Sequence, residues 1–120
     1  MKKTFSVILI CSLILSTAIC AFAKSNSVKK GSYTMNYTLT GVKDSNAGAT
    51  TDSNGATDVI AYVGIFSYKN NTAKNSTSGQ DLGYISKFLS SNGGNRFVSY
   101  HNLKDDSYRP IGNSLTLELK

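Results

Sequence analysis

The chain contains few residues that could carry out acid–base catalysis. His101 is the only histidine, Glu118 is the only glutamate, and Arg96 and Arg109 are the only arginines among its 120 residues. A small basic ribonuclease needs a general base, a general acid and a cation that binds phosphate, and this inventory permits one. However, no spacing brings these residues together, and one histidine alone is weak support for catalysis. We therefore expect no catalytic residue and no enzymatic activity, with a small secreted basic ribonuclease as an alternative.

Motifs for nucleotide, metal or nucleophilic chemistry do not occur in the sequence. There is no phosphate-binding loop, dinucleotide fingerprint, HExxH or GxSxG pattern. Hydrolysis by a pair of carboxylates is disfavoured, because Asp105 and Asp106 are adjacent and their side chains point apart in an extended chain. The segment beginning at Asp52 has oxygen ligands that suit calcium, but its glycine comes fourth rather than sixth and its twelfth residue is Val63 rather than glutamate. The sequence predicts neither a metal site nor a cofactor.

Tyrosines are the main candidates for residues that bind a ligand. The chain has seven tyrosines, and those within strands are expected to pack in the core or across strand pairs. Tyr68 and Tyr108 lie near predicted loops, beside Lys69 and Arg109. Exposed tyrosine next to polar and cationic side chains makes an adaptable contact surface for a glycan or a protein. We predict a ligand-binding site made of Tyr68, Lys69, Tyr108 and Arg109.

The first 23 residues have the three parts of a secretory signal peptide. Lys2 and Lys3 precede an uncharged stretch that is most apolar over 7–15, and Ala21-Phe22-Ala23 supplies the small-residue cleavage site. We predict cleavage after Ala23 and a secreted domain over 24–120. A retained membrane anchor is the weaker alternative, because four hydroxyl residues interrupt the stretch and lysines follow it. A lipoprotein is disfavoured, because isoleucine precedes each cysteine.

The predicted mature domain must fold without covalent crosslinks. Both cysteines lie within 1–23, so 24–120 has no disulfide, no thiol nucleophile and no cysteine metal ligand. Its charge is +4, from 11 basic and 7 acidic side chains without a dense cluster. Such scattered charge is typical of solubility rather than of nucleic-acid binding. We expect no nucleic-acid partner and no stable membrane insertion after cleavage.

Alternating patterns predict β-strands. In 32–40 and 114–120, apolar side chains alternate with polar ones, as in strands with one buried face. The most apolar segment, 57–68, is rich in β-branched and aromatic residues on both faces and predicts a central strand, with Gly64 at a bulge or a close backbone approach. A further strand is predicted over 95–103. The polar segments 41–56 and 69–80 are predicted to be loops.

Residues 82–91 are open to two interpretations. Leu82, Ile85, Phe88 and Leu89 fit helical spacing, whereas Asn92-Gly93 favours a hairpin turn. We favour a hairpin of 83–90 with 95–103. Five strands and long polar connections then predict an all-β fold, a small antiparallel β-sandwich or partly open barrel.

The expected function follows from the leader and the composition of the domain. Serine, threonine, asparagine and glycine make up 44 of residues 24–120. A leader followed by such a cysteine-free domain is similar to many small secreted proteins of Gram-positive bacteria. We expect a non-enzymatic binding protein that acts at or near the bacterial cell envelope on a cell-wall polymer, glycan or protein. A bacteriocin-like antagonist is a second alternative.

Overall fold

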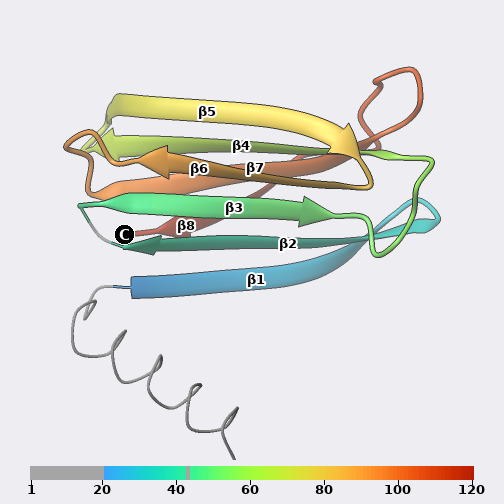
Figure 1. Ribbon diagram of the computed structural model, residues 1–120, viewed down its shortest axis with the longest axis horizontal. Coiled ribbons are helices and arrows are strands. Elements are labelled where there is room, and N and C mark those ends of the chain that lie inside the picture. The colour runs from blue at the N-terminus through green and yellow to red at the C-terminus, as the bar shows by residue number, and fades with distance from the viewer. Residues whose placement is uncertain (1–20, 43) are drawn as a thin grey trace, which may run out of the picture.

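The computed structural model describes residues 21–42 and 44–120, and its regular elements there are all β-strands. Figure 1 shows them in chain order: β1 (Ala21–Lys30), β2 (Tyr33–Val42), β3 (Asn46–Asp52), β4 (Ile60–Lys69), β5 (Thr72–Leu82), β6 (Tyr84–Ser90), β7 (Arg96–Lys104) and β8 (Leu115–Leu119). No helix in the described part of the chain is long and apolar enough to cross a membrane.

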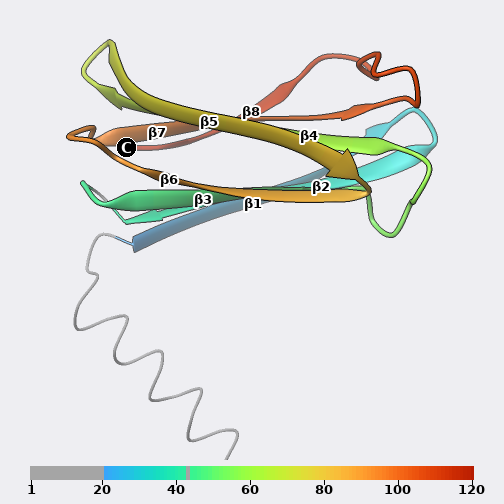
Figure 2. The ribbon, with the colours of Figure 1, turned by 45° about the horizontal axis from the view of Figure 1, so that its top comes forward.

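The strands form two antiparallel sheets of four. One sheet has the order β1-β2-β3-β6, and the other has the order β5-β4-β7-β8. Figure 2 shows the two sheets as separate layers, with β5, β4, β7 and β8 above β6, β3, β2 and β1. The predicted all-β, antiparallel class is confirmed.

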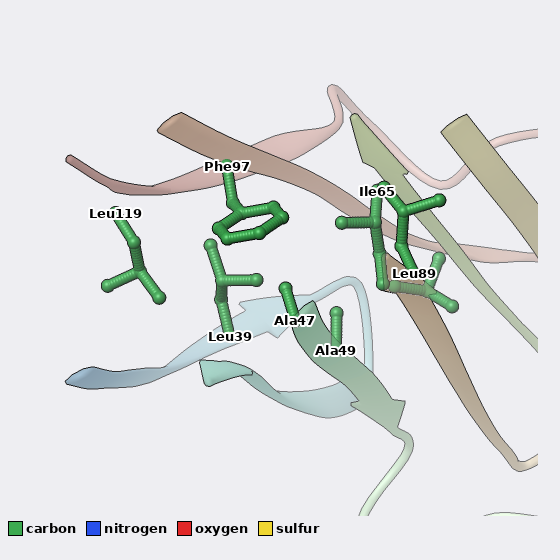
Figure 3. Packing of buried hydrophobic residues seen from close by; sticks show 8 residues of the cluster. Leu39, Ala47, Ala49, Ile65, Leu89, Phe97 and Leu119 are labelled. Atoms are coloured by element: carbon green, nitrogen blue, oxygen red, sulfur yellow. The ribbon is translucent and has the colours of Figure 1, made fainter. Parts of the chain in front are cut away.

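The main core lies between the two sheets. Leu39, Ala47 and Ala49 come from the first sheet, and Ile65 and Phe97 come from the second; all five are buried. Figure 3 shows their side chains directed toward one another across the space between the sheets. Since neighbouring side chains of a strand point to opposite faces, the odd-numbered positions of β4 and β7 face this core and the even-numbered positions face outward.

Gly83 carries the chain from one sheet to the other. It is the single residue between β5 and β6, with φ of 75°. Its amide donates a hydrogen bond to the carbonyl of Val59 at 2.8 Å, and its carbonyl accepts one from the amide of Ser53 at the same distance. Glycine suits this corner because a left-handed conformation costs little without a Cβ atom.

The alternating patterns correctly predicted the core-facing strands. β2 buries Met35, Tyr37 and Leu39, while β8 buries Leu119. β4 is a central strand between β5 and β7, as its two apolar faces predicted.

Three strands were not predicted, so the described chain has eight strands rather than five. β3 lies within the predicted loop 41–56, β5 lies mostly within the predicted loop 69–80, and β1 was not anticipated. β3 turns only alanine and threonine toward the core, which makes its pattern weakly apolar. β1 and β5 are edge strands with mostly exposed side chains, held by backbone hydrogen bonds to one neighbour each.

The predicted hairpin of 83–90 with 95–103 is wrong. β6 pairs with β3, whereas β7 pairs with β4 and β8, so the two segments belong to different sheets. The turn at Asn92-Gly93 is present, with φ of 48° and 87°, but it connects the two layers. The helical alternative is also wrong, because 84–90 is a strand.

The predicted leader lies mostly outside the described residues, which begin at 21. Its last three residues open β1 and pair with Thr40, Gly41 and Val42 of β2. Cleavage after Ala23, which stays a prediction, would leave Lys24–Lys30 of this strand paired.

Candidate functional site

Aromatic side chains gather on the outer face of the sheet β5-β4-β7-β8. Tyr62, Phe66 and Tyr68 occupy even-numbered positions of β4, and Tyr100 lies beside them on β7. The ring centroids of Phe66 and Tyr68 are 6.3 Å apart in a stacked arrangement, and those of Phe66 and Tyr100 are 5.4 Å apart edge to face. All four are half-buried because they cover one another. We call these four residues the aromatic strip.

Gly64 allows the Tyr62 ring to lie along the sheet. A Cβ atom at Gly64 would lie 3.1 Å from the Tyr62 hydroxyl oxygen and 3.7 Å from a ring carbon of Phe66. The Tyr62 side chain therefore passes over the glycine toward Phe66, and the strip continues across the gap at position 64. Neither prediction for Gly64 is confirmed: the atoms nearest this position are side-chain atoms of Tyr62 and Phe66, and the register irregularity of β4 lies at Ser67 and Tyr68.

Two cations cover the ends of the strip. The guanidinium of Arg96 lies 4.6 Å from the Tyr68 ring centroid, and the ammonium of Lys104 lies 4.6 Å from that of Tyr62. Arg96 also forms an ion pair with Glu118, with 2.9 Å between Nη1 and Oε1. These positions favour cation–π attraction and hold both cations against the aromatic rings.

The ionisation of two groups on this face follows from their neighbours. The hydrogen bond from Arg96 lowers the pKa of Glu118, so this carboxylate is charged at neutral pH. Burial, followed by the neighbouring Tyr68, raises the pKa of Tyr100. The Tyr100 hydroxyl is therefore protonated at neutral pH and can donate a hydrogen bond.

A surface pocket lies at each end of the strip. The first, of about 420 Å³, is lined by Ile60, Gln80, Asp81, Leu82, Asp106 and Tyr108; we call it the tyrosine pocket. It adjoins the strip, because Gln80 accepts a hydrogen bond from Lys104 at 2.9 Å. The second, of about 290 Å³, is lined by Asn70, Asn71, Asn95, Arg96 and Lys120; we call it the basic pocket.

The structure places the four predicted site residues in two separate pairs. Tyr68 and Lys69 end β4 beside Arg96, whereas Tyr108 and Arg109 follow β7 at the opposite end of the sheet, where Ile60 pairs with Lys104. Ile60 and Tyr68 are eight residues apart along the strand, or about 27 Å. Tyr68 belongs to the aromatic strip and Tyr108 lines the tyrosine pocket. The two pairs are thus connected by one face but do not form one compact site.

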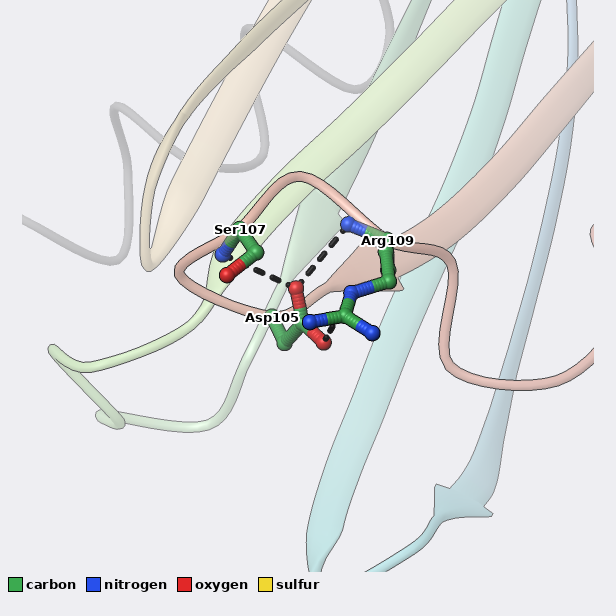
Figure 4. Close-up of polar contacts among 3 residues, drawn as sticks. All are labelled: Asp105, Ser107 and Arg109. Atoms are coloured by element: carbon green, nitrogen blue, oxygen red, sulfur yellow. Dashed lines mark hydrogen bonds and ion pairs between the residues drawn. The ribbon is translucent and has the colours of Figure 1, made fainter.

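Arg109 is held by its own loop. Figure 4 shows the carboxylate of Asp105 accepting hydrogen bonds from the backbone amides of Ser107 and Arg109, each at 2.9 Å. The Arg109 guanidinium lies 3.8 Å from the same carboxylate. Its side chain is 78% exposed and lies outside both pockets.

The residues of the ribonuclease alternative do not converge. His101 is fully buried between the sheets, with its ring nitrogens bonded to Thr51 Oγ1 at 2.8 Å and Ser99 Oγ at 2.6 Å. Glu118 and Arg96 lie on the outer face of the same sheet. Among the described residues, no group of three potential metal-ligating side chains comes together.

No family model, curated protein or solved structure matches this chain. Tyr62, Phe66, Tyr100 and Arg96 were missed as site residues. Their signal was present in the sequence: the even-numbered positions of 57–68 and 95–103 carry aromatic and cationic side chains on the face opposite the core residues.

Proposed function

We propose that this chain is a small secreted, non-enzymatic binding protein that holds a glycan of the bacterial cell envelope against the aromatic strip. We further propose that its two sheets form a β-sandwich that serves as a rigid support. The observation that carries the proposal is the row of rings along β4, with Tyr62 laid over Gly64 toward Phe66.

The chemistry of the strip suits sugar rings. The faces of a pyranose ring carry C–H groups that pack against aromatic rings, while its hydroxyls extend sideways and need hydrogen-bond partners. Ser76, Ser78 and Gln80 on β5 lie directly across from Phe66, Gly64 and Tyr62. Thr116 on β8 lies across from Tyr100. An apolar floor with a polar border is the usual composition of a ligand site.

Two further features support secretion and a non-enzymatic role. The charged start, apolar stretch and Ala21-Phe22-Ala23 motif support secretion. The burial of the only histidine supports a role without acid–base catalysis, because a substrate has no access to its ring.

Retention on insoluble glycans and on purified cell-wall sacculi tests the binding function. Phe66→Ala removes the central ring of the strip, and we expect about a tenfold loss of affinity, as for a central contact residue. Phe88→Ala is the matched control, because Phe88 is 79% exposed on the outer face of the other sheet. We expect the control to bind as the wild type does. A wild-type protein that is not retained on any glycan or sacculus, or an equal loss in both variants, would overturn the proposal.

Mass spectrometry of the expressed protein tests secretion. A product that begins at Lys24 and appears in the culture medium is expected. Recovery of the uncleaved chain from the cytosol would contradict the secretory assignment.

A further inference from the structure

The basic pocket adjoins the aromatic strip through one shared residue. Arg96 lines the pocket, and its guanidinium also lies over the Tyr68 ring. A ligand that follows the strip toward Tyr68 therefore meets the pocket directly. From Tyr62 to Tyr68 the strip extends over six residues, about 20 Å, which favours an extended polymer over a small molecule.

Local turns position the walls of the pocket. Asn70 and Asn71 form the connection between β4 and β5, with Asn70 in the left-handed region at φ of 56°. The amide of Asn95 donates a hydrogen bond to the carbonyl of Tyr68 at 2.8 Å, which draws the start of β7 against this turn. The pocket thus joins three segments that are far apart in the sequence.

The lining of the pocket favours an anion. Its lining side chains are two cations and three amides, and none of them is a carboxylate. A guanidinium has five N–H donors, and the ion pair with Glu118 uses Nη1. The tyrosine pocket at the other end contains Asp81 and Asp106 instead, so a negative group is disfavoured there. The two ends of the strip therefore differ in the charge that they accept.

We propose that the basic pocket binds a phosphate or carboxylate substituent of the same glycan whose sugar rings lie on the aromatic strip. The ligand is then an anionic polysaccharide, oriented with a charged group beside Arg96 and Lys120. This inference rests on the proposed glycan-binding function and adds the chemical class of the ligand. Glu118 limits the affinity, because its carboxylate competes for Arg96.

Titration with three soluble polymers tests the class of ligand. The probes are a phosphate-bearing wall polymer, a polysaccharide containing uronic acids and a neutral polysaccharide. We expect at least one anionic polymer to bind about tenfold more tightly than the neutral one, with an advantage that shrinks as salt is added. The anionic polymer that binds more tightly identifies whether the pocket prefers phosphate or carboxylate.

Variants that remove single charges test whether the anionic group of the polymer binds in the basic pocket. The double variant Arg96→Gln/Lys120→Gln is expected to bind the anionic polymer no more tightly than the neutral one. Lys120→Gln alone is expected to weaken binding of the anionic polymer severalfold and to leave binding of the neutral polymer unchanged, because Lys120 lines the basic pocket but is not part of the aromatic strip. Arg109→Gln is the matched control, because it removes the same kind of charge at the far end of the sheet and outside both pockets. Glu118→Gln is expected to raise the affinity for the anionic polymer severalfold. Thermal unfolding of each variant confirms that it is folded.

The possible outcomes separate the two proposals. Equal binding of neutral and anionic polymers would overturn the anionic ligand and leave glycan binding intact. The anionic ligand would also be overturned if Arg109→Gln lost as much affinity for the anionic polymer as the double variant, or if Glu118→Gln gained none. Either result would show that the anion does not bind at Arg96. Binding to none of the polymers and no retention on sacculi would overturn both proposals.

Discussion

Acidification should destabilise this protein through its single histidine. His101 is fully buried, and both its ring nitrogens contact hydroxyl groups, those of Thr51 and Ser99. The Thr51 hydroxyl donates its own proton to the carbonyl of Tyr62 at 2.8 Å, so it accepts from Nδ1–H of the ring. Nε2 is then the acceptor for the Ser99 hydroxyl. A neutral imidazole satisfies this arrangement, whereas a second ring proton would face the Ser99 hydroxyl without a carboxylate to balance the charge.

The magnitude follows from the pKa of His101. Burial lowers this pKa from its ordinary value of 6.5 to about 4, and a backbone hydrogen bond to Thr50 opposes the shift only in part. The unfolded chain therefore binds a proton between pH 6.5 and 4 that the folded chain does not bind. The histidine's contribution to stability is complete above pH 6.5 and is lost as the pH falls toward 4. Linkage gives a loss of about 2 kcal/mol between pH 7 and pH 5, and about 3 kcal/mol in all.

Urea unfolding followed by circular dichroism at pH 7, 6 and 5 measures this loss. His101→Gln is the matched variant, because it keeps a buried polar side chain but does not titrate; we expect it to be less stable at pH 7 and nearly insensitive to pH over this range. Over this range Glu118 stays ionised in the folded protein, because the hydrogen bond from Arg96 lowers its pKa. Proton NMR of the only imidazole gives the folded pKa directly. A midpoint near 6.5, or an equal loss of stability in wild type and variant, would refute the reasoning.

Two further predictions concern residues that hold the sheets together. Thr51→Val keeps the shape of the side chain but removes the hydrogen bonds to Tyr62 and His101, so we expect a loss of about 1 to 2 kcal/mol in urea unfolding; an unchanged midpoint would mean that these bonds contribute nothing. Gly83→Ala should cost more than about 2 kcal/mol, because its Cβ would lie 2.7 Å from the carbonyl oxygen of Ala56. Gly55→Ala also has a positive φ but no atom within 4 Å, and it should cost only about 1 kcal/mol; equal losses would contradict the assignment of Gly83 as the tight corner.

The candidate site was predictable in part. Tyr68 was identified from its polar and cationic neighbours and lies in the aromatic strip. Tyr62 and Phe66 could have been found from the register of β4, because core residues at 61, 63 and 65 turn 62 and 66 outward. The position of Tyr108 relative to Tyr68 was not predictable, because it depends on how far the β7–β8 loop lies from the turn after β4.

The spacing of apolar side chains is enough to show which faces of the predicted strands turn toward the core. In β2, β4 and β8, apolar side chains recur at every second residue, and burial of apolar surface requires that face to turn inward. The same alternation defined the outward positions on which the aromatic strip is built.

The presence of β1, β3 and β5, and the pairing partners of β6 and β7, emerge only in the folded chain. These choices depend on backbone hydrogen bonds, which are the same for every residue except proline and leave no mark on side-chain patterns. The pairing of β4 with β7 sets Tyr68 beside Arg96, and the pairing of β7 with β8 brings Glu118 to the same guanidinium. The arrangement of charge and rings on the outer face is therefore a consequence of strand order.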